Sequence, residues 1–239
     1  HSTILYGDVN ILNLIPTIKK HRINYNEIKI LFYSRIWCFL GSYKKGGIVN
    51  LEGYEAAYFK NQMAKVIYAM IDVILISNNK YVSSYYKKIE VFKEFFSADY
   101  DSLNSYLSYA LENKFSPSSD KILVSEIRSI LSDLASEFFK VFSSGLSLAY
   151  NKEINGPEQI VRAFKRDHRL LIKKWMFNLF KPSRKNEFNE LICRTYLVGS
   201  IINKDLFSQA VKYYKLINRE ERGNPTYDDI RVNIVKLIF

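Results

Sequence analysis

The chain contains few cysteines, prolines and glycines, and each shortage excludes a class of protein. Its 239 residues include two cysteines, Cys38 and Cys193, which are too few and too far apart for a disulfide framework or a zinc cluster. Both lie in apolar helical patterns, so we expect buried, reduced thiols and a cytoplasmic location. Nine glycines and five prolines are too few for a fold rich in tight hairpins. No apolar run reaches the roughly 20 residues of a membrane-spanning helix, so we expect no membrane partner.

The abundant residues are apolar and basic. Hydrophobic side chains make up 48% of the chain and aromatic ones 15%, a composition that argues against disorder. Lysine and arginine outnumber aspartate and glutamate by 35 to 24, which gives a formal net charge of +11. This charge favours an anionic partner such as nucleic acid or a nucleotide, while a basic surface without a specific partner is the alternative.

The clearest helical pattern lies in residues 58–77. Apolar residues recur there at the three- and four-residue steps that place side chains on one face of a helix: Phe59, Met63, Val66, Ile67, Met70, Ile71 and Ile74. Lys65 and Asp72 interrupt the remaining surface, so the pattern predicts an amphipathic helix with a wide apolar face. Asn78 and Asn79 are expected to end it, because asparagine tolerates a left-handed backbone.

Similar spacing predicts helices over most of the chain: 25–40, 85–96, 99–113, 122–150, 156–180, 186–202, 205–217 and 227–237. The short stretch 2–7 is β-branched and aromatic and ends at a glycine, which predicts a strand. The predicted fold class is therefore all-α, a multi-helix bundle with one short N-terminal strand.

The best internal boundary begins at Pro117. Either Ser118 or Ser119 is expected to cap the helix that follows, because a serine hydroxyl can accept a hydrogen bond from a free amide of the first turn. The boundary predicts two helical lobes, residues 1–116 and residues 117–239.

The most basic part of the chain runs from Arg162 to Lys185. On a helix, one stripe is formed by Arg162, Lys165 or Arg166, Arg169 and Lys173, opposite the apolar residues of the same segment. Such a stripe can follow the phosphates of a nucleic acid, and each contact adds salt-dependent affinity. The predicted nucleic-acid-binding residues are Arg162, Lys165, Arg166, Arg169, Lys173 and Lys174, and the alternative is a solvated outer face.

Arg162 and His168 have the Arg-x5-His spacing. This spacing resembles the Arg and His pair of the helical HEPN ribonucleases. The resemblance implies that Arg162 stabilises negative charge and that His168 acts as an acid and base on RNA. His168 also falls in line with Phe164 and Trp175, a position that favours a buried core histidine instead.

No other catalytic or metal-binding pattern is visible in the sequence. His1 and His21 have no cysteine, histidine or carboxylate neighbours at metal-ligand spacing. No glycine-rich loop ends in Gly-Lys-Ser or Gly-Lys-Thr, and no predicted strand carries the Asp-x-Asp pair that holds catalytic magnesium. No metal or cofactor is therefore expected in this chain.

A series of short motifs follows in order through the N-terminal part of the chain. They are Ile4–Asp8 with its Leu-Tyr-Gly, Ile15-Pro16, Tyr33–Trp37, Lys65–Ile76, Asn78–Lys80 and Tyr81–Tyr85. In this order the motifs, which cover about residues 3–96, resemble the helical region that follows the catalytic sheet in nucleotidyltransferase-fold proteins of the polymerase-β type.

The resemblance carries expectations about function. In that family the catalytic Gly-Ser and the metal-binding carboxylates precede the Leu-Tyr-Gly strand, so this chain is expected to be an accessory, substrate-binding helical domain. Its implied partners are an upstream nucleotidyltransferase domain or a nucleotide substrate, and magnesium and a nucleotide are expected only with that domain. The residues to which the resemblance assigns a substrate-facing role are Lys65, Asp72, Tyr81 and Tyr85. The alternative is that they are solvent-facing charges and packed aromatic rings.

Overall fold

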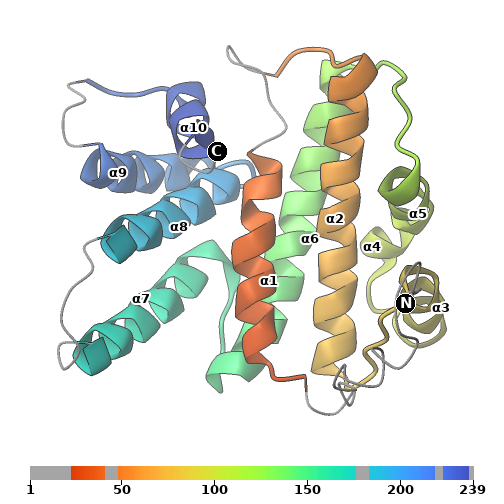
Figure 1. The fold of residues 1–239 in the computed structure, drawn as a ribbon, viewed down its shortest axis with the longest axis horizontal. Coiled ribbons are helices and arrows are strands. Elements are labelled where there is room, and N and C mark those ends of the chain that lie inside the picture. Colours follow the sequence, from red (N-terminus) through yellow and green to blue (C-terminus); the bar gives the residue numbers. More distant parts are fainter. Residues whose placement is uncertain (1–22, 41–47, 176–182, 219–222, 237–239) are drawn as a thin grey trace, which may run out of the picture.

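A computed structural model describes residues 23–40, 48–175, 183–218 and 223–236 of the chain (Figure 1). In these ranges the regular structure is helical, apart from one antiparallel bridge between Leu51 and Ile122. The predicted all-α multi-helix fold is therefore confirmed. The strand predicted at residues 2–7 lies outside the described ranges.

Three helices stand side by side at the centre of the molecule (Figure 1). They are α1 (Asn26–Ile36), α2 (Gly53–Ser77) and α6 (Val124–Tyr150), and a single 3-10 turn, η3 (Trp37–Phe39), extends α1. Because the apolar faces of all three point inward, they bury one another's hydrophobic side chains. The face predicted for residues 58–77 is buried along its whole length, as the spacing indicated.

The remaining helices flank this centre on opposite sides (Figure 1). Beside α2 lie α3 (Tyr85–Phe95), α4 (Asp101–Ser105) and α5 (Leu107–Phe115). Beside α1 lie α7 (Gly156–Trp175), α8 (Ser183–Gly199), η4 (Lys204–Leu206), α9 (Phe207–Ile217) and α10 (Tyr227–Lys236). The single helix predicted over 99–113 is two short helices, because the chain turns at Tyr106 between α4 and α5.

Aromatic rings fill the centre of the core. The ring centroid of Phe32 on α1 lies 5.3 Å from that of Phe138, 5.4 Å from that of Phe142 and 5.4 Å from that of Phe164 on α7. The hydrophobic cluster extends from Ile28 to Ile230 and includes residues on both sides of Pro117. The division into two lobes at Pro117 stays a prediction.

Gly145 allows the central helices to approach closely. A Cβ atom added at this position would lie 2.5 Å from Cγ1 of Val73 on α2 and 3.2 Å from the Ile28 side chain on α1. Atoms of real side chains do not come this close, so the missing Cβ is what lets α6 pack against both neighbours.

The start of α6 differs from the prediction. Ser118 donates to the carboxylate of Asp120, and neither Ser118 nor Ser119 caps the helix. The helix begins at Val124, whose amide donates to Asn50 Oδ1 at 3.0 Å. The serine prediction is wrong because the linker runs extended beside the segment before α2 and places a distant asparagine at the helix end.

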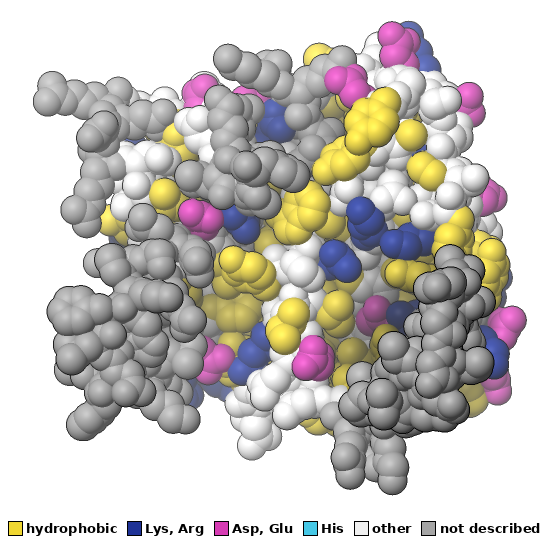
Figure 2. Space-filling model, in the orientation of Figure 1, with side chains coloured by type: hydrophobic (Ala, Val, Ile, Leu, Met, Phe, Trp, Pro, Cys, Tyr) yellow, Lys and Arg dark blue, Asp and Glu magenta, His cyan; other side chains and the backbone are white. Residues whose placement is uncertain are grey.

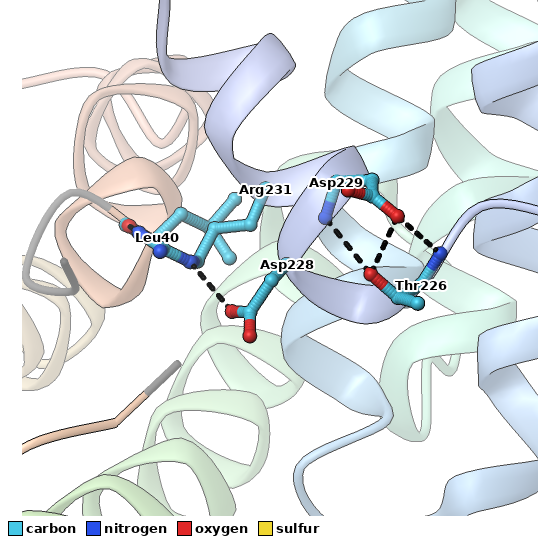
Figure 3. A network of polar contacts seen from close by, with 5 residues as sticks. All are labelled: Leu40, Thr226, Asp228, Asp229 and Arg231. Carbon is cyan, nitrogen blue, oxygen red and sulfur yellow. Dashed lines mark hydrogen bonds and ion pairs between the residues drawn. The ribbon is translucent and has the colours of Figure 1, made fainter. Parts of the chain in front are cut away.

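The last described helix is anchored to the end of η3 by a buried arginine (Figure 3). Arg231 on α10 is 2% exposed, donates to the carbonyl of Leu40 at 3.2 Å and lies 3.4 Å from Asp228. At the start of α10, the Thr226 hydroxyl donates to Asp229 and accepts from the Asp229 amide, a capping pair. The arginine therefore ties α10 to the residue that follows η3.

Both cysteines are buried and unpaired by disulfides, as predicted. Burial raises the pKa of Cys38 to about 11, although the charges of Arg35 and Lys65 oppose the shift. Among the described residues, no helix combines the length and apolarity that crossing a bilayer requires.

Candidate functional site

A polar cleft of about 810 Å³ lies where α6 ends and α7 begins, with α1 alongside. Its charged lining consists of Lys29, Lys152, Glu153, Arg162, Arg166 and Asp167. Because the cations outnumber the acids, the cleft has a net positive charge and suits an anionic ligand.

The turn between the two helices is held by serine side chains of α6. The helix ends at Asn151, which adopts a left-handed backbone, and α7 starts at Gly156 with φ of +73°. The amide of Ile154 donates to Ser147 Oγ at 3.0 Å, and the amide of Gly156 donates to Ser143 Oγ at 2.9 Å. These bonds fix where α7 starts, and the helix then carries its arginines into the cleft.

In one part of the cleft, the charged side chains are already paired with each other. Lys29 lies 2.9 Å from the Asp167 carboxylate and 3.9 Å from the centroid of the Tyr150 ring. Burial and the neighbouring Asp167 charge raise the pKa of Tyr150 above its usual value. The phenol therefore stays neutral at ordinary pH, and the Lys29 and Asp167 charges largely cancel.

The other cations of the cleft are exposed to solvent. Arg162 and Arg166 are exposed, stand one helical turn apart and form no ion pair with any residue in the described part of the chain. Lys152, also exposed, has no described ion pair either. An anion that enters the cleft can therefore contact these groups without first breaking a protein ion pair.

Of the predicted nucleic-acid-binding residues, the structure brings Arg162 and Arg166 together in the cleft. Lys165 points elsewhere, with its ammonium 4.9 Å from the ring centroid of Tyr213 on α9. The side chains of Arg169, Lys173, Lys174 and His168 lie outside the described residues, although the backbone of α7 continues to Trp175. The acid–base role of His168, and its alternative as a core residue, stay predictions.

A second cluster gathers most of the predicted substrate-binding residues. Asp72 on α2 lies 2.6 Å from the ammonium of Lys88 on α3, which in turn lies 4.9 Å from the ring centroid of Tyr81 and 5.2 Å from that of Tyr85. Lys88 is only 4% exposed. It was not among the residues predicted from the sequence, yet its position one turn after Tyr85 and one turn before the buried Phe92 was a usable signal.

Lys65, the remaining predicted substrate-binding residue, lies nearly two turns before Asp72 on the same helix and is half-buried. Between them, Tyr68 is 3% exposed, and its hydroxyl has no hydrogen-bond partner among the residues that the structure describes. Burial raises the pKa of Asp72, while Lys88 and, more weakly, Arg35 oppose the shift. Figure 2 shows Lys and Arg side chains grouped over the middle of α2.

The two clusters differ in what they offer a ligand. The charges of Asp72 and Lys88 are buried and paired with each other, so their direct effect is to join α3 to α2. The cleft of α6 and α7 presents unpaired guanidinium groups in an open hollow, and it is the stronger candidate for binding. Among the described residues, no cluster of side chains suited to hold a metal ion occurs.

Comparison with known protein families, with curated proteins and with solved structures finds no match. The fold and the cleft define an all-α multi-helix protein with a basic surface hollow. The resemblances to nucleotidyltransferase-fold proteins and to HEPN ribonucleases stay predictions.

Proposed function

We propose that this protein binds nucleic acid and that the cleft between α6 and α7 holds phosphates of the bound strand. The observation that carries the proposal is the pair of exposed guanidinium groups, Arg162 and Arg166, which lack an ion-pair partner among the described residues. A guanidinium group presents planar donors that match the oxygens of a phosphate. Both groups project from the same helix, α7, so one element presents both of them to the strand.

The net charge of the chain supports the same function. A formal charge of +11 attracts polyanions over a distance, and the cleft supplies the local contacts. The sequence of α7 also contains Arg169, Lys173 and Lys174, which add to the positive charge of this helix. Each phosphate contact releases counterions and makes the affinity depend on salt.

The test is to measure binding of labelled RNA and DNA oligonucleotides by fluorescence anisotropy at two salt concentrations. We expect Arg162→Ala and Arg166→Ala to weaken binding and to reduce the log–log salt slope by about one for each phosphate that is no longer neutralised. The matched controls are Lys121→Ala and Lys204→Ala, which remove exposed charges outside the cleft. Absence of binding at low salt, or equal losses of affinity in the control variants, would contradict the proposal.

A second candidate function is the accessory, substrate-binding role in a nucleotidyltransferase-like protein. Its support is the grouping of Asp72, Tyr81 and Tyr85 around Lys88, because residues suggested by one family resemblance lie together in space. In this role the half-buried Lys65 would contact the phosphates of a nucleotide, since Lys88 is already paired.

Calorimetric titration with a nucleoside triphosphate and magnesium tests this second function. We expect Lys65→Ala to abolish the binding heat, whereas the exposed Lys87→Ala on α3 serves as a charge-matched control. If the parent chain shows no heat, or if both variants bind equally well, the accessory role is wrong for this surface.

A further inference from the structure

A smaller, apolar hollow lies beside the basic cleft. It has a volume of about 280 Å³ and lies between α1, α7 and α8. The side chains of Ile30, Tyr33, Phe164, Phe188 and Leu191 supply its carbon-rich lining. Figure 2 shows hydrophobic side chains gathered on this face over α1.

The hollow and the cleft share a wall. Lys29, Tyr150 and Asp167 line both of them. Within this wall, Lys29 contacts the Asp167 carboxylate at 2.9 Å and the centroid of the Tyr150 ring at 3.9 Å, so the three side chains that separate the hollows pack against one another. A ligand whose anionic part contacts Arg166 can therefore place an adjoining apolar part in the hollow.

We infer that the nucleic acid bound by this protein is single-stranded and that one unpaired base occupies the apolar hollow while neighbouring phosphates lie in the basic cleft. This inference rests on the proposed function. Tyr33 is 42% exposed and Ile30 is 59% exposed, so α1 presents an aromatic ring and an aliphatic side chain to an incoming base. Every base has a flat face that stacks on such side chains, whatever the sequence.

A duplex does not fit this arrangement. Its bases are paired and stacked inside the helix, and a base reaches a side pocket only after it has been extruded from the stack. A single strand carries phosphate and unpaired base on each nucleotide, which matches a basic cleft and an apolar hollow that share one wall. Together, the basic cleft and the apolar hollow therefore suit a single-stranded nucleic acid.

The experiment compares three labelled probes of equal length by fluorescence anisotropy: a single-stranded oligodeoxynucleotide, its duplex, and a single strand of abasic sites that retains the phosphates. We expect the wild-type chain to bind the base-bearing strand about tenfold more tightly than the abasic strand. Tyr33→Ala should remove this preference and leave abasic binding unchanged, while Tyr33→Phe should keep it, because the ring remains. Arg166→Ala should weaken the binding of both single strands.

The outcomes separate the two proposals. If no probe binds at low salt, the proposed function fails, and this inference fails with it. If the base-bearing and abasic strands bind equally well, or the duplex binds as tightly as the single strand, nucleic-acid binding stands and the inference is overturned. Tyr54→Ala, which removes an 81% exposed tyrosine outside both hollows, is the matched control. A loss of preference in this control equal to that of Tyr33→Ala would also overturn the inference.

Discussion

The buried ion pair between Asp72 and Lys88 allows a quantitative prediction about stability. The charged atoms are 2.6 Å apart, which corresponds to an attraction of about 6 kcal/mol at an effective dielectric constant of ~20. Removing each ion from water costs several kcal/mol, so the intact pair is close to neutral for the free energy of unfolding. When one partner is removed, the other charge stays buried and no attraction offsets its desolvation cost.

We therefore expect Lys88→Met to lower the free energy of unfolding by about 3–5 kcal/mol, and Asp72→Leu to lower it by a similar amount. The double variant should lie within about 1 kcal/mol of the wild type, because both charges are replaced by apolar groups of similar size. Urea denaturation followed by far-ultraviolet circular dichroism measures all four chains, and unchanged slopes against urea show that the same unfolding transition is compared.

The matched control is the partly exposed ion pair of Lys29 and Asp167, whose side chains are 23% and 34% exposed. Solvent screens this pair, so Lys29→Met should cost less than about 1 kcal/mol. A cost of Lys88→Met no greater than that of Lys29→Met would refute the expected effect of burial. Simple addition of the two single-variant costs in the double variant would refute the expected coupling of Asp72 and Lys88.

Three further predictions concern the same core. Burial raises the pKa of Asp72 in the folded state, so the stability linked to its protonation is present at low pH and is lost as the pH rises through the folded pKa. Without Lys88 that pKa rises further. The loss of unfolding free energy in Lys88→Met, measured by urea denaturation, should therefore be smaller at pH 5 than at pH 7. Gly145→Ala should destabilise the chain by about 1–3 kcal/mol in thermal unfolding, despite the better helix propensity of alanine, because its Cβ would meet Val73 at 2.5 Å. Arg231→Met should cost about 2–4 kcal/mol in chemical denaturation, because it removes a donor to the Leu40 carbonyl, and an unchanged free energy of unfolding would refute this role of the hydrogen bond.

The helices of this protein were predictable because they depend on local sequence. The spacing of apolar residues in 58–77 identifies α2 and its buried face before any contact is known, since side chains three and four positions apart share one side of a helix. The same spacing places Arg162 and Arg166 on one exposed face of α7, opposite Ile160 and Phe164, which are buried. The fold class and the exposed positions of Arg162 and Arg166 follow from the sequence by itself.

The tertiary structure decided everything that joins residues distant in the chain. Lys29 closes one side of the cleft by pairing with Asp167, 138 positions away, and no local pattern in α1 indicates this contact. The cap of α6 comes from Asn50, 74 positions before Val124, rather than from a neighbouring serine. Local periodicity specifies which face of a helix is buried but not which partner meets it, because that choice depends on how all the helices fit together in one core.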